Sequence, residues 1–235
     1  MKSFQLATLA LLAAIALMFQ SGCDKHGQDR QVIKFTFDNT FAAANDHDGA
    51  VFVNQLSSES LDYYARTLKV ALTGKKADVQ ALPLHQRYEV LLTRLLGKRT
   101  EIKDMDGKAF AEWSITSGLW DYLPEPDLDL DLGYLTFTQT DAIGKLKANV
   151  QRTQRSRRFG SRQVMRQEST PYTVRFVLEN GQWKYDNTAY SKAIEGEIKD
   201  YVKSYKEEEN AALLKLLGDI TDRQIPPKIW NGMLQ

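Results

Sequence analysis

The chain has 235 residues, in which 31 lysines and arginines stand against 30 aspartates and glutamates, for a formal net charge of +1. This balance provides no overall field that would attract nucleic acid, so we expect no nucleic-acid partner. Hydrophobic residues form 43% of the chain, with ten tyrosines, ten phenylalanines and four tryptophans among them. That content is enough to build one sizeable folded domain.

The N-terminus has the pattern of a secretory signal. Lys2 precedes an uncharged and largely apolar run at residues 4–19. Two small residues, Ser21 and Gly22, then come directly before Cys23, which is the only cysteine of the chain. A short positive start, an apolar run and small residues before a cleavage point are typical of exported proteins.

The small pair before Cys23 resembles the lipobox of bacterial lipoproteins, in which the peptide is cut before a cysteine whose sulfur carries a diacylglycerol. The resemblance predicts a lipoprotein signal peptide at residues 1–22, lipidation of Cys23, and a polar, lipid-anchored tether at residues 23–30. Asp24 resembles the signal that retains lipoproteins of enteric bacteria in the inner membrane. We therefore expect a protein held on a membrane of the cell envelope, with the inner membrane favoured.

Two alternatives for this segment stay open. As an uncleaved anchor, the run at residues 4–19 is shorter than the roughly 20 apolar residues that span a bilayer. Cleavage by ordinary signal peptidase needs an A-x-A-like site, and none precedes Cys23. Both fit the residues less well than lipidation does.

Apolar residues recur at helical spacing through the first half of the chain. Ser57 is a typical N-cap, and Pro83 suits the first turn of a helix. Gly74 and Gly97 follow the last apolar residues of the two helices that start there. Four helices are predicted, at about residues 33–44, 57–74, 83–97 and 106–117.

The second half of the chain changes to the alternation of β-strands, followed by a return to helical spacing. Strands are predicted at about residues 134–139, 145–154, 172–179 and 183–185. Asn180 and Gly181 form the tight-turn pair between the last two. Helices followed by antiparallel strands predict an α+β fold, in which the N-terminal helices pack on a curved sheet.

This order, ending in the sequence Val-Arg-Phe-Val-Leu-Glu-Asn-Gly-Gln-Trp-Lys-Tyr-Asp at residues 174–186, resembles the nuclear transport factor 2-like superfamily. The resemblance implies one domain at residues 31–190, with a cone-shaped cavity between the sheet and the helices. In members of the superfamily that are isomerases, dehydratases or non-catalytic binding proteins, this cavity holds the ligand. The aromatic residues that could line it are Trp113, Trp120, Tyr172, Phe176 and Trp183. The same residues could instead be core, because large apolar side chains preferentially fill interiors.

Residues 191–235 are predicted to form a C-terminal helical extension, with one long helix at about residues 191–217. Its apolar residues, which include Ile194 and Ile198, form a seam with heptad-like spacing. The seam is too short to specify a coiled coil. Packing on its own domain and pairing with a second copy of the chain therefore both stay open.

Charged residues gather in two places. An arginine-rich stretch without acids is predicted to form a hairpin tip and an interaction surface, with Arg155, Arg157, Arg158 and Arg162 as its candidate residues. The acidic stretch at residues 121–131 resembles the start of a calcium loop. Leu132 and Thr138, however, stand where such a loop needs its glycine and its bidentate glutamate. We expect no metal and no cofactor.

No residue pattern in the chain identifies a reaction. The phosphate-binding, dinucleotide-binding and nucleophile-elbow motifs are all missing from the sequence. We therefore expect a membrane-tethered binding or interaction module without catalytic residues, whose partner is an unidentified protein or small molecule. Two alternatives stay open: a small-molecule isomerase or dehydratase that uses the cone, and a structural protein that dimerises through its C-terminal helix.

Overall fold

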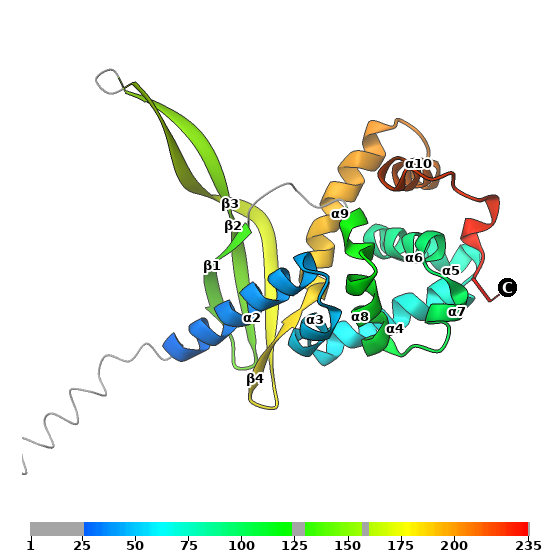
Figure 1. Ribbon diagram of the computed structural model, residues 1–235, viewed down its shortest axis with the longest axis horizontal. Helices are drawn as coiled ribbons and strands as arrows, with labels where there is room; N and C mark the ends of the chain where they lie inside the picture. The colour runs from blue at the N-terminus through cyan, green and yellow to red at the C-terminus, as the bar shows by residue number, and fades with distance from the viewer. Residues whose placement is uncertain (1–25, 124–129, 157–159, 235) are drawn as a thin grey trace, which may run out of the picture.

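The computed structural model describes residues 26–123, 130–156 and 160–234. In these ranges the chain is an α+β fold, as the sequence predicts (Figure 1). The helices before the sheet are α2 (Gly27–Asn45), α3 (Gly49–Gln55), α4 (Ser58–Thr73), α5 (Lys76–Gln80), α6 (Leu84–Leu96), α7 (Arg99–Ile102), α8 (Gly107–Thr116) and the 3₁₀ helix η1 (Leu119–Tyr122). The strands are β1 (Leu130–Phe137), β2 (Asp141–Ser156), β3 (Gly160–Glu179) and β4 (Gln182–Asp186). The helices after the sheet are α9 (Asn187–Ser204), α10 (Glu209–Thr221) and the 3₁₀ helix η2 (Pro227–Trp230).

The four strands form an antiparallel sheet in the order β1-β2-β3-β4, so each strand pairs with its neighbour in the sequence. Asn180 and Gly181, whose φ angles are 49° and 76°, make the turn between β3 and β4 that their sequence predicts. The strands differ greatly in length. β1 and β4 have 8 and 5 residues, whereas β2 and β3 have 16 and 20.

Among the described residues, no third strand pairs with residues 149–156 and 160–167 of β2 and β3, and we call this two-stranded projection the arm. β1 pairs with β2 only as far as Leu130 opposite Ala148, whereas β2 and β3 remain paired up to Gly160. Figure 1 shows the arm as a twisted ribbon that extends away from the helices. The arm adds length to the molecule without covering the core.

Helix α2 lies against the sheet and contacts β1 and β4 (Figure 1). Ile33 and Phe37 of this helix are buried, as the helical spacing of its apolar residues predicts. The opposite side of α2 faces solvent, where Phe35 is 65% exposed. One side of the helix is thus part of the core, and the helix holds the N-terminal end of the described chain on the sheet.

The start of α2 is attached to the sheet by side chains. The indole N–H of Trp183 donates a hydrogen bond to Asp29 (2.9 Å), and the ring of His26 stacks on Phe137 with 4.2 Å between centroids. Residues 27–30, which the sequence assigned to the tether, therefore form the first turn of a helix that is bound to the sheet. The chain between Cys23 and this helix is shorter than the polar composition suggests.

Helices α4, α6 and α8 pack together and supply much of the core, which is continuous with the inner face of the sheet. Their ends are the predicted ones. The side chains of Ser57 and Asp106 accept hydrogen bonds from backbone N–H groups in the first turns of α4 and α8. Pro83 directly precedes α6, and Gly97 directly follows it.

The C-terminal extension contains two helices rather than the single long helix that the sequence predicts. Helix α9 ends at Ser204, and the chain turns at Lys206, whose φ is 56°. Glu208 then caps α10 by accepting hydrogen bonds from the backbone N–H groups of Asn210 and Ala211. Because of this turn, α10 packs back against α9 and α6 (Figure 1).

The apolar seam of this region lies mostly inside its own chain. Ile194 and Ile198 of α9 are 4% and 1% exposed, and Leu213 of α10 is fully buried. Tyr201 is the exception, with half of its surface exposed. Of the two alternatives for the seam, packing on its own domain therefore describes the structure.

Candidate functional site

The predicted ligand-lining residues of the sheet are packed in the interior. Tyr172, Phe176 and Trp183 are at most 7% exposed. The ring of Phe176 meets the ring of Tyr185 at 5.9 Å, and the hydroxyl of Tyr172 donates a hydrogen bond to Glu197 of α9. These side chains connect the sheet to its neighbours rather than surround an open space.

The two predicted tryptophans from the helical half belong to other parts of the same interior. Trp113 of α8 stacks on Phe110 with 5.7 Å between the ring centroids. Trp120 of η1 meets Phe52 of α3 edge-on at 5.0 Å. None of three hollows of the described chain is lined by any of the five predicted aromatics. The structure does not bring these residues together as one site.

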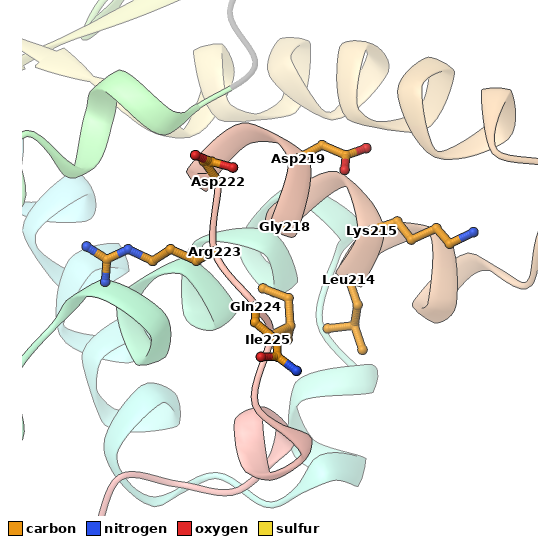
Figure 2. Close-up of a pocket in the computed structure, with 8 residues that line it drawn as sticks. All are labelled: Leu214, Lys215, Gly218, Asp219, Asp222, Arg223, Gln224 and Ile225. Atoms are coloured by element: carbon orange, nitrogen blue, oxygen red, sulfur yellow. The ribbon is translucent and has the colours of Figure 1, made fainter.

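One hollow, of about 630 Å³, lies between α10 and the segment that follows it (Figure 2). Its lining residues are Leu214, Lys215, Gly218, Asp219, Asp222, Arg223, Gln224 and Ile225. The charged side chains point away from one another rather than toward a common point, as Figure 2 shows. Asp219 accepts a hydrogen bond from the hydroxyl of Tyr205 (2.6 Å). A shallow hollow with mixed and divergent charges is no arrangement for catalysis.

A partly buried polar cluster at the contact of α4, α6 and α9 is the most unusual group of titratable residues in the described chain. The hydroxyl of Tyr63 donates to the carboxylate of Glu89 (2.7 Å). Nδ1 of His85 lies 2.7 Å from the carboxylate of Glu195, and the His85 ring stacks on Tyr63 with 6.2 Å between centroids. Lys199 forms an ion pair with Glu195 (2.6 Å).

Local sequence places two of these groups together. His85 and Glu89 are four residues apart on α6, so they share one face of the helix. The sequence analysis did not single out Glu89, Tyr63 or Glu195. The spacing of four residues between His85 and Glu89 on α6 is the signal that could have indicated a polar contact there.

Burial sets the protonation of this cluster. It raises the pKa of Glu89 to about 7, and the hydrogen bond from Tyr63 only partly opposes this. Burial also lowers the pKa of His85, against the influence of the neighbouring Glu195. For Glu195, burial acts to raise the pKa, but the hydrogen bonds from Lys199 and His85 outweigh it and lower the pKa. Glu89 therefore holds or releases a proton near neutral pH.

An acid that titrates near pH 7 beside a tyrosine hydroxyl is chemically suited to general acid–base catalysis. A substrate would have to reach the carboxylate. Neither Glu89 nor Tyr63 lines any of the three hollows, whose nearest approach along α6 is Gln86. The cluster therefore has the chemistry of an active site without a described opening.

The arm carries the predicted interaction surface. In the β2–β3 ladder Arg155 lies opposite Ser161, and Arg162 lies opposite Gln154. Arg162 thus belongs to a paired strand, whereas the sequence predicted that it lies in a hairpin tip. Arg157 and Arg158 lie outside the described residues, as does the lipidation candidate Cys23.

Positive charge continues to the base of the arm. Arg166 is exposed, and the ammonium group of Lys147 lies 5.0 Å from the ring centroid of the exposed Tyr134. No acid occurs between residues 142 and 167. At the base, the side-chain amide of Gln167 donates to Asp131 of β1 (3.2 Å). The basic stretch found in the sequence therefore coincides with a projecting structural element.

Comparisons of the chain with protein-family models, with curated proteins and with solved structures found no match. Among the described residues, no helix is long and apolar enough to cross a membrane. The same residues contain no group of three or more histidine, cysteine, aspartate or glutamate side chains that could hold a metal ion. The function is therefore argued from the residues and the geometry alone.

Proposed function

We propose that the protein is a lipid-anchored domain of the bacterial cell envelope that acts as a non-catalytic interaction module, with the arm as its contact element. The observation that carries this proposal is the arm itself. A two-stranded ribbon that leaves the domain is paired only between its own two strands among the described residues, and a lone pair of strands adds little stability by itself. Its basic sequence is typical of an interaction surface.

The position of α2 supports the anchor. Three residues, 24–26, separate Cys23 from the start of α2 at Gly27. Even a fully extended connection of this length spans only on the order of 14 Å. A diacylglycerol on Cys23 would therefore hold the folded domain directly at the surface of a membrane, and Asp24 favours the inner one.

The superfamily resemblance remains part of the proposal. A meander of antiparallel strands with helices before it is compatible with a nuclear transport factor 2-like domain. The described residues of the sheet interior are aromatic and packed, which supports a binding role over catalysis in a cone. Contacts would then be made by the outside of the domain.

Fractionation of cells that express the full chain tests the anchor. The wild type is expected in the membrane fraction, and Cys23→Ala is expected to leave it or to accumulate unprocessed in small amount. Asp24→Asn is the matched control, because it changes the next residue and keeps the thiol. Cys23→Ala that is processed and still membrane-bound would contradict the lipid anchor.

Cysteine accessibility tests the contact role of the arm. With the thiol of Cys23 capped, Ser161→Cys adds a single reactive thiol to the arm. We expect this thiol to react more slowly in intact cells than in the purified protein, because a partner covers it. Thr100→Cys on the exposed helix α7 is the control. Equal protection at both positions, or none at residue 161, would contradict the proposal.

A small-molecule isomerase or dehydratase is the second candidate, and one observation favours it. The Tyr63–Glu89 pair combines a hydroxyl donor with a carboxyl group whose pKa is raised to about 7. Glu89→Gln and Tyr63→Phe would each abolish turnover of a substrate while leaving the fold intact. A substrate whose turnover survives both changes would exclude this pair as its catalytic group.

A further inference from the structure

We infer that the arm binds the anionic phospholipid surface of the same membrane that holds the anchor, so that arm and anchor together fix the orientation of the domain. This inference rests on the proposed function. It names the partner of the arm, which the charge of the arm alone leaves open between a lipid surface and an acidic protein.

The first observation is that the arm and the start of α2 lie toward the same end of the longest axis of the molecule. In Figure 1, whose longest axis is horizontal, the arm extends toward the upper left and α2 begins at the lower left, so both lie on the left side of the view. Helices α5 and α7 lie toward the opposite end. A lipid attached four residues before Gly27 therefore brings the membrane to the end from which the arm projects.

The second observation is the separation of charge along the chain. Residues 142–167 contain eight of the 31 lysines and arginines and none of the 30 aspartates and glutamates. The rest of the chain is left with 23 basic and 30 acidic residues. An anionic surface therefore attracts the arm and repels the remainder of the protein, which favours one orientation.

The third observation is the kind of side chain on the arm. Besides arginine, its two strands carry mostly glutamine, threonine, serine and asparagine, with Val150, Val164 and Met165 as the large apolar residues. Protein interfaces commonly use buried tryptophan, tyrosine or phenylalanine as anchors, and residues 149–156 and 160–167 contain none of these. Arginine forks suit phosphate groups, and a lipid headgroup layer offers them at high density.

Spin-label accessibility on the full, lipidated chain tests the inference. The label is attached to Ser161→Cys, since Cys23 is capped by its lipid, and Thr100→Cys on α7 is the control site. The protein is reconstituted into vesicles of phosphatidylcholine or of an equimolar mixture with phosphatidylglycerol. We expect residue 161 to be less accessible to a water-soluble relaxation agent in the anionic vesicles than in the phosphatidylcholine vesicles. Residue 100 should be equally accessible in both.

Charge variants separate arm binding from the net charge of the protein. Replacing Arg152, Arg162 and Arg166 by glutamine is expected to lower the ratio of membrane-bound to free arm by roughly 100-fold. The matched control replaces Lys98, Arg99 and Lys103, three exposed cations around α7, and is expected to change nothing. Protection at residue 161 should also disappear at 1 M salt, where the screening length falls to about 3 Å.

The possible failures are distinguishable. A protein that does not float with the vesicles has no lipid anchor, which overturns the proposed function and the inference together. A protein that floats with both kinds of vesicle, but whose residue 161 is equally accessible in both, overturns the inference and leaves the anchor. In that case protection of residue 161 in cells would identify an acidic protein as the partner.

Discussion

Glu89→Gln is the most informative change in the helical half, because the structure fixes both the sign and the size of its effect. The carboxyl group of Glu89 is partly buried beside Tyr63, and its pKa is about 7 in place of the usual 4.5. The folded chain therefore keeps a proton that the unfolded chain releases. Stability falls as the pH rises from 4.5 to about 7 and is level above that.

The expected size follows from the difference between these two pKa values. Each pH unit in this interval costs about 1.4 kcal/mol, so the folded state loses roughly 3 kcal/mol between pH 4.5 and pH 8 through this one group. Glutamine stays neutral and still offers an oxygen to the Tyr63 hydroxyl. The free energy of unfolding of Glu89→Gln, relative to that of the wild type, should therefore increase by roughly 3 kcal/mol between pH 4.5 and pH 8.

Urea denaturation at several pH values between 5 and 8 measures this difference. Subtracting variant from wild type removes the contributions of other titrating groups, such as His85. Glu112→Gln is the matched control, because Glu112 is an exposed carboxylate on the neighbouring helix α8. A difference between wild type and Glu89→Gln that does not change with pH would refute the reasoning.

Two further predictions concern contacts between distant segments. Arg94→Met removes the guanidinium that donates to four backbone carbonyls, including that of Ile229, and should cost about 3 kcal/mol of unfolding free energy. It should also speed hydrogen exchange at Met233, and unchanged exchange there would contradict this role. Trp183→Phe removes the bond to Asp29 and should cost about 1 kcal/mol, with faster exchange confined to the first turns of α2. Equal exchange in α2 would show that the bond does not hold its start.

Local signals in the sequence predicted most of the elements. The caps at Ser57 and Asp106 and the stop at Gly97 are set by neighbouring residues, so the ends of α4, α6 and α8 were predicted nearly correctly. The Asn180-Gly181 turn was predicted for the same reason. Where a few adjacent residues decide the geometry, no knowledge of the tertiary structure is needed.

Other features depend on parts of the chain that lie far apart. The long helix predicted after residue 190 is divided at Lys206. The apolar seam is interrupted by the polar residues 206–210, but this interruption alone does not show that α10 turns back and packs on α6. The arm was missed as a continuous ribbon, because its strands are mostly polar in sequence and lack the alternation that marks a strand. Arg162 was therefore assigned to a tip.

The residues of the candidate sites could likewise be predicted from the sequence only in part. The basic stretch was visible in the sequence, because like charges without acids are a local pattern. The Tyr63–Glu89 pair joins α4 to α6, and its partner histidine contacts Glu195 of α9. Only the packing of three helices brings these groups together, so no single segment indicates them. The five aromatic residues were predicted as a ligand site from the family resemblance, and in the structure they pack in different parts of the core.

The mass of the N-terminal peptide decides whether Cys23 carries a lipid anchor. The full chain is extracted from membranes with detergent, digested, and its N-terminal fragment is analysed by mass spectrometry. The account predicts a fragment that begins at Cys23 and carries a diacylglycerol. A fragment that begins at Met1, or one that contains Cys23 with a free thiol, would contradict it.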